Sequence, residues 1–254
     1  MTIRTIAQIK KELADESVEE EYLDLLRSDN RKGVQKLLEQ YDRRQDQKRE
    51  YKHQFEQMKS FEYSCREKGS HIIAGIDEAG RGPLAGPVVA AAVILPEDYY
   101  LEGLYDSKKI PLAKREEFFQ SLKAHADCGV GIVSNEEIDQ HNIYQATKLA
   151  MKRAVMDLTQ VPEHLLIDAM YLEESEVPQT YLVKGDQRSV SIAAASIIAK
   201  VTRDRIMSEW HDNYPMYHFR SNQGYGTKEH LEALKTYGVS PLHRKSFAPV
   251  KENS

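Results

Sequence analysis

Cysteine is scarce in this chain of 254 residues. The two cysteines, Cys65 and Cys128, form no CxxC pair and no spaced framework, which excludes a disulfide-stapled secreted domain and favours a reducing compartment. No apolar run approaches the ~18 residues that cross a membrane, and the N-terminus lacks the apolar core of a signal peptide. We therefore expect a cytoplasmic protein with no membrane partner.

Several well-known catalytic motifs are also missing. The sequence has no GxSxG turn, no HExxH motif and no Cys/His spacing typical of zinc. Ser191 and Ser196 lie in a stretch of small residues, VSIAAASIIAK, where they are expected to pack rather than to act as nucleophiles. These absences disfavour serine-hydrolase and zinc chemistry.

Residues 1–70 contain no proline and only two glycines, Gly33 and Gly69. Their apolar residues recur at helical spacing, which predicts two short helices and then a long one that reaches about Arg66. We expect a helical N-terminal appendage over residues 1–70 and a second domain over residues 71–254.

The pattern changes at residue 71. Helical patterns there cover residues 111–125, 144–158, 190–210 and 227–238. Strands are predicted for the apolar runs HIIAGID, VVAAAVIL, CGVGIVS, HLLIDAM and TYLVKGD. Strands interleaved with helices predict an α/β layer architecture.

Acidic residues follow three of these apolar runs: Asp77 with Glu78, then Asp168, then Asp186. Active sites of α/β sheets gather at strand ends, and carboxylates that meet there repel one another unless they are protonated or bound to cations. Mg²⁺ prefers such oxygen ligands, and two ions ~4 Å apart are the usual centre for phosphodiester hydrolysis. A single such Asp is commonly a turn or cap former, but the repetition and the doublet favour a metal site.

Glycines and basic residues accompany the acids. Gly80-Arg81-Gly82 follows the doublet directly, and its backbone N–H groups and Arg side chain suit a phosphate or sugar. Net charge is roughly −9 over residues 71–183 and about +4 over residues 184–254, which suits metal ions and a polyanion held together. Tyr225 lies between glycines and is either exposed for stacking on a sugar or base or packed at a helix entrance. Further basic residues flank Asp186 and the helix after it: Lys184, Arg188, Lys200 and Arg203.

In order along residues 71–250, the motifs GIDEAGRGPLAGPVVAAAVIL, YDSKK, LLIDAM, VKGDQRSVSIAAASIIAKVTRD, NQGYGTKEH and HRKSFAPV resemble bacterial ribonuclease HII. The resemblance implies an RNase H-like fold with a mixed central sheet flanked by helices and a helical C-terminal part. It implies an endonuclease that hydrolyses the RNA strand of RNA–DNA hybrids. It also implies cleavage 5′ to single ribonucleotides embedded in duplex DNA, leaving 3′-hydroxyl and 5′-phosphate ends, with roles in ribonucleotide and RNA primer removal.

The family's functional residues match positions of this sequence. The family's metal-binding acids match Asp77, Glu78, Asp168 and Asp186, which implies two divalent ions, Mn²⁺ or Mg²⁺. The substrate-binding residues that the resemblance and the neighbouring basic residues indicate are Gly80, Arg81, Gly82, Lys184 and Tyr225. Related type 3 enzymes lack an intact GRG after the acidic doublet, so the motif favours type 2. The expected partners are RNA–DNA hybrids and DNA duplexes that contain ribonucleotides, and a monomer is expected.

Some alternatives stay open at the level of sequence. The chain could be a different metal-dependent nuclease on the same fold, or a catalytically silent hybrid-binding module, because a fold alone does not guarantee activity. The appendage either raises affinity for the duplex or covers an apolar face of the catalytic domain. The first role predicts that a chain beginning near Ser70 folds by itself, and the second predicts that it does not.

Overall fold

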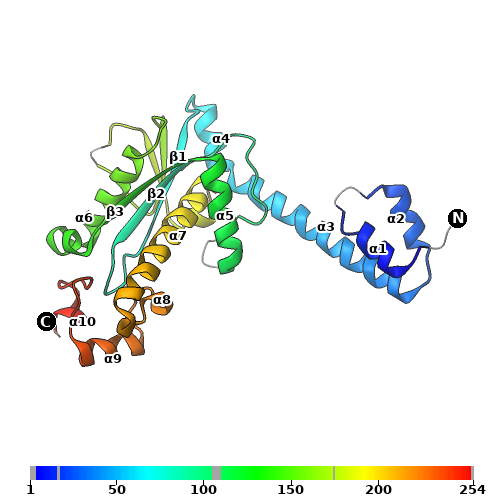
Figure 1. The fold of residues 1–254 in the computed structure, drawn as a ribbon. Coiled ribbons are helices and arrows are strands. Elements are labelled where there is room, and N and C mark those ends of the chain that lie inside the picture. Colours follow the sequence, from blue (N-terminus) through cyan, green and yellow to red (C-terminus); the bar gives the residue numbers. More distant parts are fainter. Residues whose placement is uncertain (1–3, 16–17, 105–109, 174, 253–254) are drawn as a thin grey trace. The chain divides into compact units, whose positions relative to one another are not determined.

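The structure, a computed structural model, describes residues 4–15, 18–104, 110–173 and 175–252, so the YDSKK motif lies outside the described residues. The chain divides into two compact units, Met1–Gln54 and Phe55–Ser254 (Figure 1). The domain boundary expected at residue 70 stays a prediction. None of the helices in the described ranges has the length and apolar character needed to cross a membrane.

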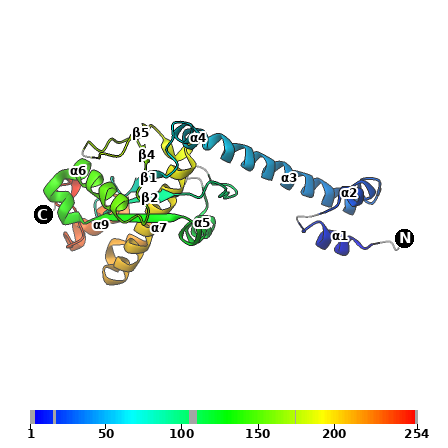
Figure 2. The same ribbon diagram turned by 90° about the horizontal axis from the view of Figure 1, so that it is seen from above.

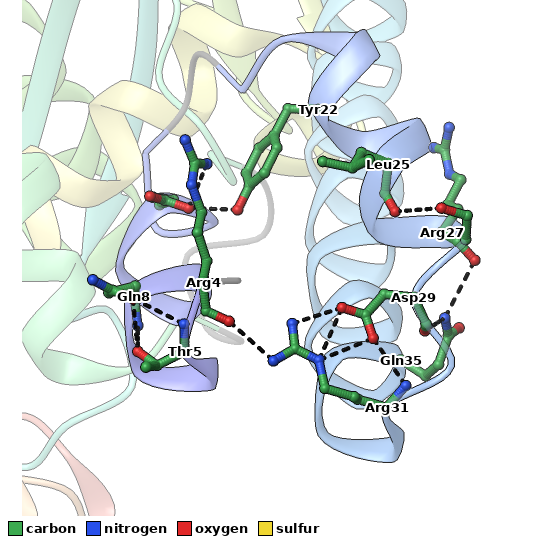
Figure 3. Close-up of polar contacts among 11 residues, drawn as sticks. Arg4, Thr5, Gln8, Tyr22, Leu25, Arg27, Asp29, Arg31 and Gln35 are labelled. Carbon is green, nitrogen blue, oxygen red and sulfur yellow. Dashed lines mark hydrogen bonds and ion pairs between the residues drawn. The ribbon is translucent and has the colours of Figure 1, made fainter. Parts of the chain in front are cut away.

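The first unit is built from helices α1 (Ile6–Glu12) and α2 (Glu20–Arg27) and from α3 (Lys32–Met58) as far as Gln54. Thr5 and Gln8 form a reciprocal capping box that starts α1, as drawn in Figure 3. The helices enclose a small apolar core of their own: Ile9, Leu13, Leu23, Leu26, Val34, Leu38 and Tyr41.

Polar contacts close the turns of this unit. The Arg31 guanidinium pairs with the Asp29 carboxylate at 2.6 Å and donates to the Arg4 carbonyl at 2.9 Å (Figure 3). The Gln35 amide donates to the Asp29 carbonyl at 2.6 Å. These hydrogen bonds therefore join the start of α3 both to the α2–α3 turn and to the segment before α1.

The single long helix predicted to reach about Arg66 is wrong. Helix α3 ends at Met58, and a separate helix, α4 (Ser60–Glu67), follows Lys59. Phe55 and Met58 are buried in the main core of the second unit, and Cys65 is buried in a smaller cluster of that unit. The break lets two short helical faces bury apolar side chains in different places, which one straight helix would not do.

All five predicted strands form one mixed sheet in the order β3-β2-β1-β4-β5. Strands β1, β2 and β3 are antiparallel neighbours, whereas β4 and β5 run parallel to β1. The bounds are β1 (Ile73–Ala79), β2 (Val88–Ile94), β3 (Asp127–Val133), β4 (His164–Asp168) and β5 (Gln179–Leu182).

Helices cover both faces of the sheet (Figure 1 and Figure 2). Side chains alternate along β2: Ala91 and Val93 pack in the core with α5 (Leu112–His125) and α7 (Val190–Asn213). Ala90 and Ala92 pack in the opposite core with α6 (Asn135–Met156). Short elements complete the unit: η1 (Gly185–Gln187), η2 (Pro215–Tyr217), α8 (Phe219–Asn222), α9 (Lys228–Tyr237) and α10 (Ala248–Lys251).

Candidate active site

Asp77 is the buried member of the acidic doublet on β1. Its side chain is on the face that meets α7, because residues two apart on a strand share a face and Gly75 lies against the α7 backbone. The Ser196 hydroxyl and the Glu78 backbone N–H hydrogen-bond the Asp77 carboxylate. Burial, the Glu78 charge and the Asp168 charge nevertheless raise the pKa of Asp77 well above its ordinary value. The pocket around Asp77 therefore has an excess of negative charge.

Asp168 ends the neighbouring strand. The parallel register pairs Ile76 with Ile167, so Asp77 and Asp168 come next in adjoining strands. The Asp168 carboxylate accepts a hydrogen bond of 2.6 Å from the backbone N–H of Gly185. Asp168 therefore contacts the turn that leads from β5 into α7.

Asp186 does not end a strand, contrary to the sequence pattern. Strand β5 stops at Leu182, and Asp186 is buried in the 3₁₀ turn η1, next to the Gly185 that bonds Asp168. Lys184 precedes this turn, exposed and in a left-handed conformation with φ of 57°.

Backbone geometry thus brings the acids to one end of the sheet, but their carboxylates are turned toward different donors. Within the ranges described, no three His, Cys, Asp or Glu side chains are already arranged as a metal site. Glu78 accepts from Arg81 Nη1 at 3.3 Å, while Asp77 and Asp168 accept from Ser196 and from Gly185. Each of these three carboxylates therefore has a donor of its own, which offsets part of their mutual repulsion.

The GRG segment and Tyr225 are adjacent, although 143 positions separate Gly82 from Tyr225 in the numbering. A Cβ placed on Gly82 would lie 3.6 Å from the Tyr225 ring. The Leu84 backbone N–H donates to the Gly224 carbonyl at 2.8 Å, which ties the two loops together. The Tyr225 side chain is 46% exposed, so the ring is not packed away at the entrance of α9.

The basic residues predicted to flank Asp186 and the helix after it lie in different surroundings. Arg188 is exposed, and its guanidinium lies 5.0 Å from the Phe61 ring centroid. Lys200 is paired with Asp204 at 2.5 Å. Arg203 lies on the helix after Asp186, as expected, but it is only 1% exposed and donates to backbone carbonyls. Sequence pattern alone gave no signal for a buried arginine in a helix.

Sequence reasoning also missed a buried histidine pair. His230 Nε2 and His243 Nε2 are 3.0 Å apart, and neither side chain is exposed. The Ser240 backbone N–H donates to His243 Nδ1 at 3.0 Å, so the His243 proton is on Nε2 and is donated to His230. His230 Nδ1–H in turn donates to the Tyr225 carbonyl at 2.9 Å.

The sheet order, the flanking helices and the acids at adjoining strand ends define the RNase H-like class of nucleases. The solved ribonuclease H2 of Pyrococcus horikoshii OT3 is 27% identical with a TM-score of 0.62, covering 71% of this chain and 95% of that one. The ribonuclease HII in the PCNA complex from Archaeoglobus fulgidus is 28% identical with a TM-score of 0.62, covering 69% and 95%. A Bst-RNase HIII solved with Mn²⁺ shares the fold at 20% identity and a TM-score of 0.62, covering 75% and 71%.

Family models identify the chain more closely. The ribonuclease HII model matches residues 74–250, and the ribonuclease HII N-terminal domain model matches residues 5–66. A ribonuclease HII of Bacillus cereus (strain B4264) is 54% identical over 253 residues, which is 99% of this chain and 97% of that protein. A Bacillus cytotoxicus ribonuclease HII is also 54% identical, over 252 residues, covering 99% and 96%. The chain therefore belongs to the ribonuclease HII family, endonucleases that cleave RNA paired with DNA.

Proposed function

We propose that this enzyme cuts on the 5′ side of ribonucleotides, including a single ribonucleotide in duplex DNA, with two divalent ions, Mg²⁺ or Mn²⁺, held by the four acids. The observation that carries the proposal is the contact between the GRG segment and Tyr225 next to the acidic doublet. A Gly82 Cβ would lie only 3.6 Å from the exposed Tyr225 ring, and Arg81 bonds Glu78.

The acids fit hard divalent cations. Their donors are carboxylate oxygens, which Mg²⁺ and Mn²⁺ prefer, and burial with two neighbouring carboxylates raises the pKa of Asp77. A cation would offset that excess charge. Asp77, Glu78, Asp168 and Asp186 would hold the ions, after their side chains leave the present hydrogen bonds. When bound, such ions activate the attacking water and stabilise the leaving 3′ oxygen.

The protein's own residues would supply selectivity. Phosphate contacts cannot tell RNA from DNA, because both strands have phosphates. The 2′-hydroxyl distinguishes them, and the exposed backbone of Arg81 and Gly82 is available to hydrogen-bond it. The Tyr225 ring would stack on the next sugar, where a further hydroxyl would clash. Exposed Lys184 would contact the phosphate backbone.

A substrate panel tests this proposal. A duplex with one ribonucleotide, a long RNA–DNA hybrid and an all-DNA duplex are incubated with Mg²⁺ or Mn²⁺, and cut sites and end groups are determined. We expect cleavage 5′ to the ribonucleotide, 5′-phosphate products and an intact all-DNA duplex. Cleavage of all-DNA, or none at the single ribonucleotide, would refute the proposed selectivity.

Two variants separate chemistry from recognition. Asp77→Asn should abolish cleavage while the Tm in metal-free buffer stays equal or rises, because one repelling charge is gone. Tyr225→Ala should lose roughly tenfold to hundredfold in kcat/KM on the single-ribonucleotide duplex, the cost of a stacked contact, and less on the long hybrid. Near-normal turnover of Asp77→Asn would contradict the metal assignment, and equal losses for Tyr225→Ala would contradict the role of the ring.

A further inference from the structure

Arg203 and Arg244 are the largest of the fully buried side chains, at 1% and 0% exposed. In the part of the chain that the structure describes, neither guanidinium forms an ion pair with a carboxylate. Burial lowers the pKa of Arg203 to about 10. Burial and the nearby Arg203 charge lower the pKa of Arg244 to about 9. Burying two cations side by side is costly, so a compensating role is to be expected.

Both arginines donate hydrogen bonds to backbone carbonyls around the GRG segment. Arg203 donates from Nε to the Pro87 carbonyl at 3.0 Å and from Nη2 to the Ala85 carbonyl at 3.2 Å. Arg244 donates to four carbonyls of the same loop: Gly80 at 2.5 Å, Arg81 at 2.9 Å, Gly86 at 2.9 Å and Pro87 at 3.1 Å. Apart from an isolated bridge between Ala85 and His243, the loop that joins β1 to β2 has no regular structure. The planar fork of arginine satisfies its carbonyls in place of a strand ladder.

The fit between Arg203 and the loop is close. Gly80 has a φ of +96°, and a Cβ on it would lie 2.1 Å from Arg203 Nε and 2.7 Å from the Pro87 carbonyl oxygen. Glycine at this position is therefore required by the arginine packed behind it, as well as by its backbone conformation.

Arg203 also reaches the tyrosine loop. Its Nη1 donates to the Gln223 carbonyl at 3.0 Å, two residues before Tyr225. The same two loops are joined by the Leu84–Gly224 hydrogen bond. One guanidinium thus bonds both the loop that carries GRG and the loop that carries the tyrosine.

We propose that Arg203 and Arg244, the arginine pair, are positioning residues that set the GRG backbone and Tyr225 at a fixed separation and so determine selectivity for an isolated ribonucleotide. The inference rests on the proposed function of those two elements. Neither arginine touches substrate in this role. A long hybrid presents a 2′-hydroxyl at every position of one strand. A displacement of the GRG backbone relative to Tyr225 should therefore reduce cleavage of the long hybrid less than cleavage of a duplex with one ribonucleotide.

The test uses Arg203→Lys and Arg244→Lys in the full-length enzyme. Lysine keeps the charge but cannot bond several carbonyls in a plane. The matched control is Arg205→Lys, on the same helix, whose partly exposed side chain pairs with Glu116. The readouts are kcat and KM on the single-ribonucleotide duplex and on the long hybrid, with Mn²⁺ binding and Tm measured alongside.

We expect each pair variant to lose at least tenfold more kcat/KM on the single-ribonucleotide duplex than on the hybrid, with Mn²⁺ affinity unchanged and the control equal to wild type. Equal losses on both substrates in folded variants would overturn the inference. If both variants fail to fold, the pair is a stability element and the inference is also overturned. Failure of the proposed function is distinguishable, because wild type itself would then not cut at the single ribonucleotide.

Discussion

Asp77 and Arg203 both carry ionisable side chains that are buried, but their surroundings differ. Burial raises the pKa of the Asp77 carboxyl, and the charges of Glu78 and Asp168 raise it further. Arg203 faces carbonyl oxygens, which stabilise a cation without neutralising it. The first environment favours binding of a cation from solution, whereas the second is complete within the protein. This difference separates a candidate ligand site from a structural contact.

The buried histidine pair predicts a pH dependence of stability. Burial, with the neighbouring His230, lowers the pKa of His243 from 6.5 to about 4. Between these values the unfolded chain binds a proton that the folded protein does not, so the free energy of unfolding falls as the pH falls. The decrease approaches about 1.4 kcal/mol per pH unit, or about 3 kcal/mol over the window.

Urea unfolding of wild type and His243→Gln between pH 7 and 4 measures this effect. The variant should be less stable at pH 7 and show a flatter slope below pH 6.5. His125→Gln, at the exposed end of α5, serves as the control and should keep the wild-type slope. If His243→Gln and wild type have the same slope, His243 is not the titrating group.

At the scale of elements, the sequence predicted strands better than breaks and turns. Apolar runs such as VVAAAVIL identify β2 because both of its faces are buried. The break at Lys59 was not predicted, since no proline or glycine marks it and tertiary packing of Phe55 and Met58 decides it. Asp186 was placed on a strand because its apolar neighbours look alike in a strand or a short turn.

The candidate site could also be predicted only in part, because some of its residues have a local sequence signal and others do not. Acids after apolar runs are visible in sequence because charge is unusual there. The arginine pair was not predicted, because arginine is seldom fully buried and its partners are backbone carbonyls, which every residue has. The distance between GRG and Tyr225 depends on the path of the chain and has no local signal.

Helix α4 packs within the second unit, Phe55–Ser254, which also holds the candidate active site. This packing predicts the effect of truncating the chain. Glu62 is buried and accepts hydrogen bonds from the Ser189 and Ser191 hydroxyls, at 2.6 Å each, at the N-terminus of α7. A chain beginning at Ser70 lacks these bonds and the buried Phe55 and Met58. Removal of a buried Phe side chain alone costs about 3–5 kcal/mol, a large part of the roughly 5–15 kcal/mol typical of a domain.

The comparison is between chains that begin at Tyr51 and at Ser70. The first should unfold cooperatively in urea, and the second should be insoluble, molten or several kcal/mol less stable. Equal midpoints and slopes for the two chains would contradict the structural role assigned to α4. For residues 55–67, the cover over an apolar face is thus the better-supported of the two roles considered for the appendage.

At the scale of the whole molecule, the role of the first unit differs from that of α4, because the first unit has its own apolar core. Between Tyr41 and Phe55, no side chain of α3 belongs to a buried core cluster. The exposed residues there include Arg43, Arg49 and Lys52. Such cations on a solvated helix suit a phosphate backbone, and each bound phosphate releases counterions and makes binding salt-dependent.

We therefore expect the chain beginning at Tyr51 to keep the kcat of the full-length enzyme and to have a higher KM. The slope of log KM against log salt should be shallower by about 0.9 for each phosphate that the shortened chain no longer binds. Full-length enzyme with Arg43→Gln and Arg49→Gln provides the matched test of charge, since the unit stays present and should still fold. It should reproduce part of the rise in KM. If the truncated chain and the full-length enzyme have the same KM at every salt concentration, the first unit does not bind the duplex, and its partner must be sought elsewhere.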